Sequence, residues 1–276
     1  MPRLPPLEIL EYQLDEDAGS VIFSTRIGKN IVEVREDELF RWLRFNRGIT
    51  QSAILKIRPE SLLFSYTRAM MAFLLFQESP RNLFMLGLGG GSHARFVAHH
   101  LPATKVIVVE RFKRLAAVAG QHFGLPTQSA QFKLVFADAG RWIRATRARA
   151  DCIVVDLFDS HAVNPLALKT RFYVFCRERL RPGGVLVVNL MVTRDNDEQA
   201  LLQPLLSAFD RLVLPMTADD YGNYIVLAFK NKPAELQFKT LRKRAHELEK
   251  TFQMPFRRYL DKLRESNKRG DIGFVF

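Results

Sequence analysis

The sequence NLFMLGLGGGSHARFVAHHLPATKVIVVE, residues 82–110, decides the fold of this chain. It predicts a buried strand, a glycine-rich turn, a short helix and a second strand that ends in an acid. Glycine allows the backbone to turn sharply and approach a ligand closely, at φ angles that a Cβ atom would resist. An acid about 20 residues past the glycines can accept hydrogen bonds from ribose hydroxyls. The stretch therefore predicts a nucleoside site at the carboxyl end of a parallel sheet.

The glycines follow the pattern G-x-G-x-G, with Gly87, Gly89 and Gly91, and Ser92 then stands at a helix N-cap. A dinucleotide fingerprint has Gly or Ala where this chain has Ser92. The pattern therefore favours a sulfonium nucleoside, S-adenosylmethionine or a relative, over NAD. A tight turn without any ligand would also need glycine, so the acids beyond it are needed to support the interpretation.

Strands and helices alternate from the glycine stretch to about residue 229. Apolar runs at residues 133–137, 152–155 and 185–190 predict further strands, and residues 211–215 and 224–229 predict a closing antiparallel pair. This order predicts a doubly wound, mostly parallel α/β sheet. Residues 59–232 form this expected nucleoside-binding domain. Residues 1–58 predict a loose arm of about 18 residues and a small antiparallel β domain, and residues 233–276 a basic tail of two amphipathic helices broken near Pro255.

Composition indicates a globular protein, with 276 residues, 47% of them hydrophobic and 25% charged. The start of the sequence lacks the apolar stretch of a signal peptide, and no apolar run approaches the roughly 18 residues of a membrane span. Cys152 and Cys176 are expected to be core thiols in a reducing cytoplasm. The net charge of +12 allows an acidic partner such as nucleic acid, although a solvated basic tail explains much of it.

Three acids follow predicted strands directly, namely Glu110, Asp138 and Asp156. Any one of them could simply cap a helix, but ligands of an open α/β sheet bind outside the carboxyl ends of its strands. We therefore expect Glu110 to hold the ribose, Asp138 and the adjacent Ala139 to hold the adenine, and Asp156 with Asp159 to face the reacting centre.

The succession of GLGGGS, VVE, ADA and VVDLFD, preceded by FSYTRAM and followed by FY and LRPGG, resembles the polyamine aminopropyltransferases, the spermidine synthase family. The resemblance implies a small N-terminal β domain before a Rossmann domain like that of class I methyltransferases. It also implies decarboxylated S-adenosylmethionine as donor, an amine as acceptor, 5′-methylthioadenosine as co-product, and a homodimer.

The resemblance also implies roles for individual residues. Asp156 and Asp159 match a D-x-x-D loop of the family, and Tyr66 in FSYTRAM matches an assisting tyrosine. Asp156 would accept or relay a proton from the amine, Tyr66 would orient the same nitrogen, and Asp159 would anchor the acceptor. Gln51 and His161 are further candidates for substrate contacts.

Three departures from the family pattern argue against polyamine specificity, and the first of them concerns the aminopropyl end of the donor. Ser92 stands where the family has an acid, Thr67 and Arg68 follow the tyrosine in place of His or Gln and Glu, and residues 160–165 replace a D-P-x-G-P segment. Fewer acids and an added arginine argue against a polycationic acceptor.

Other functions remain open at this point. The chain could be an S-adenosylmethionine methyltransferase acting on RNA or another acidic substrate, although Asn164-Pro165 lacks the aromatic residue of an N-P-P-Y-like loop. It could also be a non-catalytic nucleoside-binding or partner-binding member, or, less favoured, an NAD-dependent oxidoreductase. The six histidines show no spacing typical of a metal site, so no metal is expected.

Overall fold

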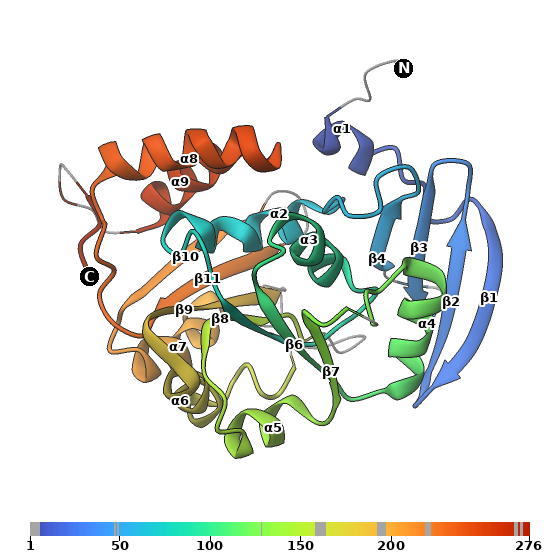
Figure 1. Cartoon of the computed structure of the whole chain (residues 1–276), viewed down its shortest axis with the longest axis horizontal. Helices are drawn as coiled ribbons and strands as arrows, with labels where there is room; N and C mark the ends of the chain where they lie inside the picture. Colours follow the sequence, from blue (N-terminus) through green and yellow to red (C-terminus); the bar gives the residue numbers. More distant parts are fainter. Residues whose placement is uncertain are drawn as a thin grey trace.

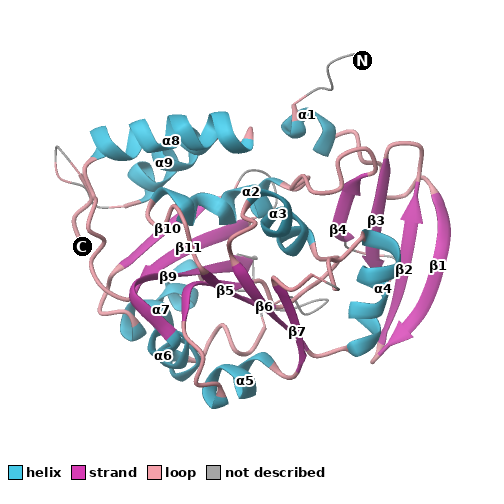
Figure 2. Cartoon of the chain, viewed as in Figure 1, coloured by secondary structure: helices cyan, strands magenta, loops and turns pink. Residues whose placement is uncertain are grey.

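Two β-sheets side by side organise the computed structural model (Figures 1 and 2), which describes residues 6–46, 48, 50–127, 129–157, 164–191, 197–218, 222–267, 270 and 273–276. The smaller sheet is antiparallel, in the order β1-β2-β3-β4. Val32 and Val34, alternate residues of one strand, are both fully buried, as the two-residue period of a strand requires. The strands are β1 (Ser20–Ile27), β2 (Asn30–Glu36), β3 (Phe40–Phe45) and β4 (Thr50–Leu55).

The larger sheet has seven strands in the order β10-β11-β9-β8-β5-β6-β7. The five neighbouring strands β9, β8, β5, β6 and β7 are parallel to one another. Strand β11 is antiparallel to β9, and β10 is antiparallel to β11. The predicted α/β fold with a separate antiparallel sheet is confirmed. The strands are β5 (Asn82–Leu86), β6 (Lys105–Glu110), β7 (Phe132–Phe136), β8 (Ala150–Val155), β9 (Leu180–Met191), β10 (Val213–Thr217) and β11 (Asn223–Phe229).

Helices cover both faces of this sheet. In β5, Leu83 and Met85 pack in one apolar cluster, and Phe84 and Leu86 pack in another on the opposite face. The first cluster contains α2 (Ser65–Met70), the 3-10 turn η1 (Met71–Leu75), α3 (Ser92–His100), α8 (Phe238–Phe252) and α9 (Phe256–Ser266). The second contains α5 (Ala139–Ala145), α6 (Thr170–Arg179) and α7 (Glu198–Ala208), while α4 (Lys113–Phe123) packs on the small sheet.

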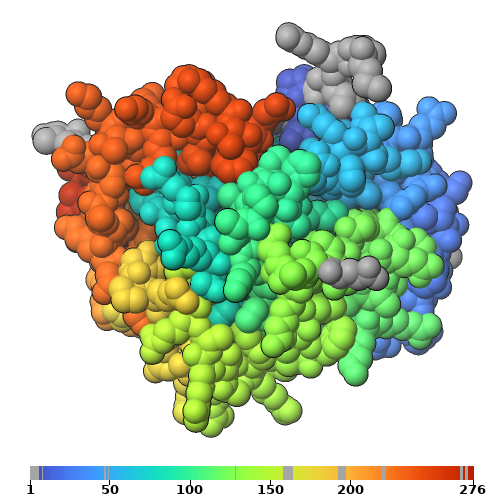
Figure 3. All heavy atoms as spheres, viewed as in Figure 1, coloured from blue at the N-terminus to red at the C-terminus, as the bar shows by residue number. Residues whose placement is uncertain are grey.

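The two C-terminal helices belong to this helical layer. Leu241 and Ala245 of α8, and Leu260 and Leu263 of α9, are fully buried. In the space-filling view α8 (orange) forms a continuous surface with the cyan segment of α2 and η1 (Figure 3). Within the described parts of the chain, every helix is too short or too polar to cross a lipid bilayer.

The expectation of a loose N-terminal arm is wrong for residues 6–18. A short helix, α1 (Leu7–Glu11), buries Leu10 and Glu11. The carboxylate of Glu11 lies 2.7 Å from the guanidinium of Arg68 in α2 and also accepts from the backbone N–H of Ser65 at 2.8 Å. A helix of five residues is too short to show a period in the sequence, and its partner lies 57 residues further along the chain.

Candidate active site

A cavity of about 430 Å³ opens at the carboxyl ends of the parallel strands. The strand order reverses there, because the chain passes from β5 to β6 and β7 on one side and returns to β8 on the other. Ligands of open α/β sheets bind at such a switch point. The predicted residues that line the cavity are Gln51, Tyr66, Gly87, Gly89, Glu110, Asp138, Ala139 and Asp156.

The glycine turn forms one wall of the cavity. Gly87 has φ of +100°, and a Cβ atom at this position would lie 2.2 Å from the backbone oxygen of Asp156. Glycine at position 87 therefore lets the end of β5 lie directly against the end of β8. Gly89 has φ of +54° and no heavy atom within 4 Å of the position of a Cβ, so its bare backbone faces open space.

Gly91 and Ser92 lie outside the lining residues. The prediction that Ser92 caps α3 is wrong, because Gly91 is the N-cap, in the left-handed region with φ of +81°, and Ser92 is the first residue of the helix. The hydroxyl of Ser92 lies 2.8 Å from the hydroxyl of Ser52 in β4 and 3.3 Å from the guanidinium of Arg95. Ser92 therefore links the glycine turn to the small sheet, behind the wall that Gly87 and Gly89 form.

Glu110 is buried at the tip of β6, with 7% of its surface exposed. Its Oε1 accepts from the backbone N–H of Phe112 at 2.7 Å. Burial raises the pKa of Glu110, and hydrogen bonds from backbone N–H groups, that of Phe112 first, act in the opposite direction. Hydrogen-bonded to the backbone in this way, the carboxylate is fixed in one orientation, as recognition of a ribose diol requires.

Asp138 caps the helix that follows β7. Its Oδ1 accepts from the backbone N–H of Arg141 at 3.0 Å, so the helix-cap role considered for a strand-end acid applies here. The same residue lines the cavity together with Ala139. A carboxylate has two oxygens and about four acceptor positions, so capping a helix leaves capacity for a ligand.

Asp156, just after β8, and Tyr66, in α2, interact electrostatically although they are far apart in the sequence. Asp156 follows β8, and its Oδ1 accepts from the amide of Asn189 at 2.9 Å. Tyr66 belongs to α2, where burial raises the pKa of its phenol well above the usual value and the carboxylates of Asp156 and Glu11 raise it further. The phenol therefore stays protonated at neutral pH and keeps a hydrogen to donate.

Arg68 has a different role from the one expected. It is 2% exposed, it is paired with Glu11, and it donates to the carbonyl oxygens of Leu62 at 3.1 Å and of Leu63. Arg68 is also absent from the lining residues. Its charge is offset by Glu11, so the argument that an added arginine opposes a cationic acceptor is wrong.

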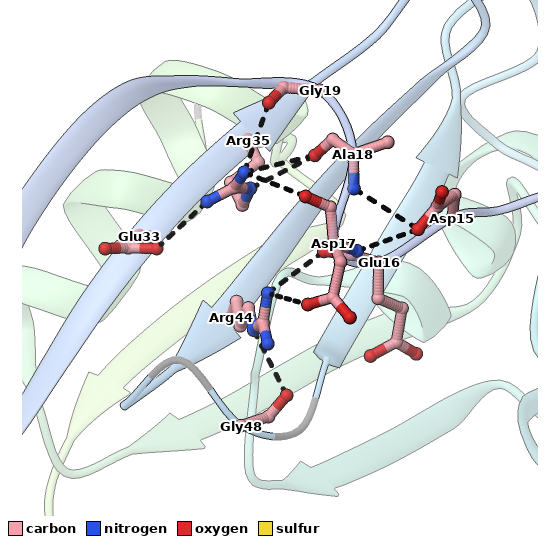
Figure 4. A network of polar contacts seen from close by, with 9 residues as sticks. All are labelled: Asp15, Glu16, Asp17, Ala18, Gly19, Glu33, Arg35, Arg44 and Gly48. Carbon is pink, nitrogen blue, oxygen red and sulfur yellow. Dashed lines mark hydrogen bonds and ion pairs between the residues drawn. The ribbon is translucent and has the colours of Figure 1, made fainter.

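Glu16 is a lining residue that the sequence did not indicate. Arg35 donates to the carbonyl oxygens of Asp17, Ala18 and Gly19, and Arg44 donates to the carbonyl oxygen of Glu16 at 3.1 Å. These bonds fix the turn before β1, and the side chain of Glu16 extends away from both guanidinium groups (Figure 4). Because the turn is fixed in this way, the half-buried Glu16 is held at the edge of the cavity.

Other lining residues come from distant parts of the chain. Asn189 and Asn223 stand at neighbouring strand ends, and Phe45, Phe64 and Phe112 add apolar walls. The candidates Asp159 and His161 lie outside the described residues. Within the described parts of the chain, no group of three or more His, Cys, Asp or Glu side chains is arranged to hold a metal ion.

Comparisons with known proteins show which family this chain resembles. A model of the spermine/spermidine synthase domain matches residues 63–193. A polyamine aminopropyltransferase of Chromobacterium violaceum is 35% identical over 237 residues, which cover 86% of this chain and 90% of that protein.

Two solved structures are similar in fold. A probable spermidine synthase from Corynebacterium glutamicum has a TM-score of 0.71 at 21% identity, covering 93% of this chain and 99% of that chain. Human methyltransferase-like protein 13, solved in complex with SAH, has a TM-score of 0.62 at 26% identity, covering 70% of this chain and 94% of that chain. Because the Chromobacterium violaceum protein is 35% identical over most of both sequences, the chain belongs to the spermidine synthase family, the polyamine aminopropyltransferases, and is a transferase.

Proposed function

We propose that the protein transfers the aminopropyl group of decarboxylated S-adenosylmethionine to an amine and releases 5′-methylthioadenosine. One observation carries the proposal: the carboxylate of Asp156 and the phenol of Tyr66 line the same cavity as the nucleoside-type residues Glu110 and Asp138. A donor with its adenosine against those acids would extend its sulfonium past Gly87 and Gly89 towards Asp156.

The reaction needs positioning and the removal of a proton. The amine nitrogen attacks the propyl carbon attached to sulfur, a C–N bond forms, and the C–S bond breaks with its electron pair leaving on a neutral thioether. A free amine has a pKa near that of Lys, about 10.4, so it is protonated at pH 7 and must lose a proton before it attacks. We assign this proton to Asp156, which passes it to solvent, and assign to Tyr66 the orientation of the same nitrogen.

The donor distinguishes this function from its strongest alternative. Calorimetry with decarboxylated S-adenosylmethionine, S-adenosylmethionine and 5′-methylthioadenosine is expected to show tighter binding of the decarboxylated form than of the intact form. A difference of at least about tenfold, or ~1.4 kcal/mol, is the expected size for one favourable or unfavourable charge contact. Tighter binding of the intact form would contradict aminopropyl transfer.

The alternative is methyl transfer from intact S-adenosylmethionine, and one observation favours it. Arg95 is 6% exposed and lies directly behind the glycine turn, where it donates to the carbonyl oxygens of Gly90 and, at 2.9 Å, of Pro59. Burial lowers the pKa of Arg95 to about 9, so the group is a cation at neutral pH. A cation there, with Ser92 in place of an acid, would attract a donor carboxylate and repel an aminopropyl ammonium.

The acceptor is proposed to be a diamine or longer polyamine, with its far ammonium bound at Glu16. Glu16→Gln is expected to raise KM for butane-1,4-diamine about tenfold, because the ammonium loses an anionic acceptor and is left with a neutral amide oxygen. KM for butan-1-amine should not change, and Glu38→Gln, an exposed glutamate of the same β region, should change neither value. An equal effect on both amines would remove Glu16 from this role.

A homodimer stays a prediction, and a nucleic-acid partner stays a possibility that the sequence does not favour. The exposed faces of α8 and α9 carry the basic residues that suggest such a partner, but several of them are paired. Arg242 lies 2.6 Å from Asp261, and Arg257 lies 2.5 Å from Glu249.

A further inference from the structure

We infer that Asn189 and Asn223 form a hydrogen-bond relay that orients the carboxylate of Asp156, so that both are positioning residues for the reaction. The inference rests on the proposed function, which assigns to Asp156 the proton of the amine. It adds two residues of the cavity wall that act on the reacting nitrogen through Asp156.

The fold brings the three side chains to one end of the sheet. Asp156 follows β8, Asn189 is near the end of the parallel neighbour β9, and Asn223 begins β11, which runs antiparallel to β9. Asn223 is paired in register with Met191, two residues beyond Asn189. Because β11 runs in the opposite direction, its first residue lies beside the last residues of β9.

The hydrogen bonds join the three side chains in one direction. The Nδ2 of Asn223 donates to the Oδ1 of Asn189 at 2.9 Å, and the Nδ2 of Asn189 donates to the Oδ1 of Asp156 at 2.9 Å. An amide has a donor end and an acceptor end. Since Asn223 occupies the acceptor end of Asn189, the donor end must face Asp156.

This direction matters for the carboxylate. A reversed Asn189 amide would place its oxygen against an oxygen of Asp156, and two acceptors would then repel each other. In the observed direction Oδ1 of Asp156 is taken by the amide, and Oδ2 is assigned to the substrate amine. Asn223 is 4% exposed, so water has little access to loosen the relay.

A neutral relay suits a cationic substrate. A hydrogen bond to an ionised carboxylate favours its charged form, which is the form that accepts a proton. Lysine or arginine in place of Asn189 would do the same more strongly but would repel an incoming ammonium group. An amide orients the carboxylate without adding charge to the cavity.

Two titratable groups from other elements also act on Asp156. Tyr66 of α2 and His93 of α3 both interact electrostatically with it. His93 is buried, lies 3.2 Å from the carbonyl oxygen of Thr67, and has a pKa that burial lowers. A test by pH must therefore compare variants in which Tyr66 and His93 are unchanged.

The test uses Asn189→Asp and Asn223→Asp in the full chain. Asn189→Asp removes the amide that donates to Asp156 and adds a second negative charge beside it, so kcat should fall at least about 100-fold. Asn223→Asp offers an acceptor to the amide of Asn189, which can then turn its oxygen towards Asp156, and kcat should fall about tenfold. The Kd of 5′-methylthioadenosine should change less than about threefold, since the relay does not contact the residues assigned to the nucleoside. Asn231→Asp, an exposed residue just past the other end of β11, is the matched control and should leave kcat unchanged.

A second measurement does not depend on turnover. With aspartate carboxyls labelled with 13C, the resonance of Asp156 is assigned as the one lost in Asp156→Asn and then titrated. The midpoint should rise by about 1 unit or more in both relay variants, because a donor to the ionised form is lost. Asn223→Ser, which cannot reach Asn189 and buries no charge, releases the Asn189 amide without forcing it to reverse, so it should raise the midpoint by less than Asn223→Asp does, and it serves if Asn223→Asp fails to fold.

The outcomes separate the two proposals. An unchanged midpoint in all three relay variants overturns the relay, whatever the enzyme transfers. If the protein turns over neither decarboxylated S-adenosylmethionine nor S-adenosylmethionine, the proposed function is contradicted. A raised midpoint would still support the relay in that case. The double variant Asn189→Asp, Asn223→Asp should be no slower than Asn189→Asp alone, because the two residues act through one bond; additive losses would overturn the relay.

Discussion

Asp156→Asn is expected to lower kcat by about 10³-fold, within the range of about 10²–10⁴ that a positioned general base contributes. The substitution keeps the size of the side chain. Its carbonyl oxygen can still accept from Asn189, which directs the new amide N–H2 towards the substrate. A donor group then faces the amine where an acceptor is needed, so the proton has no place to go.

Binding of the nucleoside should survive this change. Glu110 and Asp138 hold the adenosine in our proposal and lie at the ends of other strands, so the Kd of 5′-methylthioadenosine should stay within about threefold. Steady-state kinetics with saturating donor, together with calorimetry, measure both quantities. Asp210→Asn is the matched control, because Asp210 is exposed, lies away from the cavity and has a left-handed φ that asparagine also adopts. Retained turnover in Asp156→Asn would show that another group accepts the proton.

The fold was predictable because its signals are local. The run of β5, the glycines, α3 and β6 is continuous in sequence, and the apolar strand runs and the acids that follow them are each visible within a few residues. Right-handed crossovers then leave little choice of topology. Glu110, Asp138 and Asp156 were predictable as cavity residues for the same reason, since the ends of parallel strands meet at one edge.

The residues that escaped prediction depend on distant pairing. Asn189 and Asn223 are polar positions in apolar strands, and only the antiparallel pairing of β9 with β11 brings them beside Asp156. Glu16 depends on Arg35 and Arg44, which hold its turn from two other strands. A polar residue inside an otherwise apolar strand, next to the end that carries an acid, is the signal that could have indicated Asn189.

Arg68 shows how a correct observation led to a wrong interpretation. Its place beside Tyr66 in sequence suggested that its charge faces the substrate. Successive residues of a helix point about 100° apart, however, so neighbours two positions from a site residue face elsewhere. The buried partner Glu11 could not be inferred, because nothing in residues 6–18 indicates an ordered helix.

Arg68→Met is expected to lower the free energy of unfolding by about 3–5 kcal/mol, because it leaves the carboxylate of Glu11 buried without a cation. The two side chains are 3% and 1% exposed, so solvent cannot replace the lost partner. Urea unfolding followed by tryptophan fluorescence measures the change; Trp42 lies in the cluster that also contains Leu10 of α1. Arg242→Met breaks a pair whose members are 51% and 44% exposed, and it should cost less than about 1 kcal/mol.

The dependence on pH identifies the cause of this loss. Burial already raises the pKa of Glu11, and Arg68 is the main group that lowers it, so Arg68→Met raises the pKa of Glu11 further. A carboxyl whose pKa is raised on folding binds more protons in the folded state, so stability falls as pH rises through that interval and is regained as pH falls. The difference between the wild type and Arg68→Met should therefore shrink from about pH 8 to about pH 5, and Glu11→Leu combined with Arg68→Met should be more stable than Arg68→Met alone. The alternative outcome is a loss of unfolding free energy that stays constant with pH and is not reduced in the double variant. It would mean that Arg68 stabilises the fold through its hydrogen bonds to the Leu62 and Leu63 carbonyls. Helix α1 would then be held to α2 by packing and not by charge.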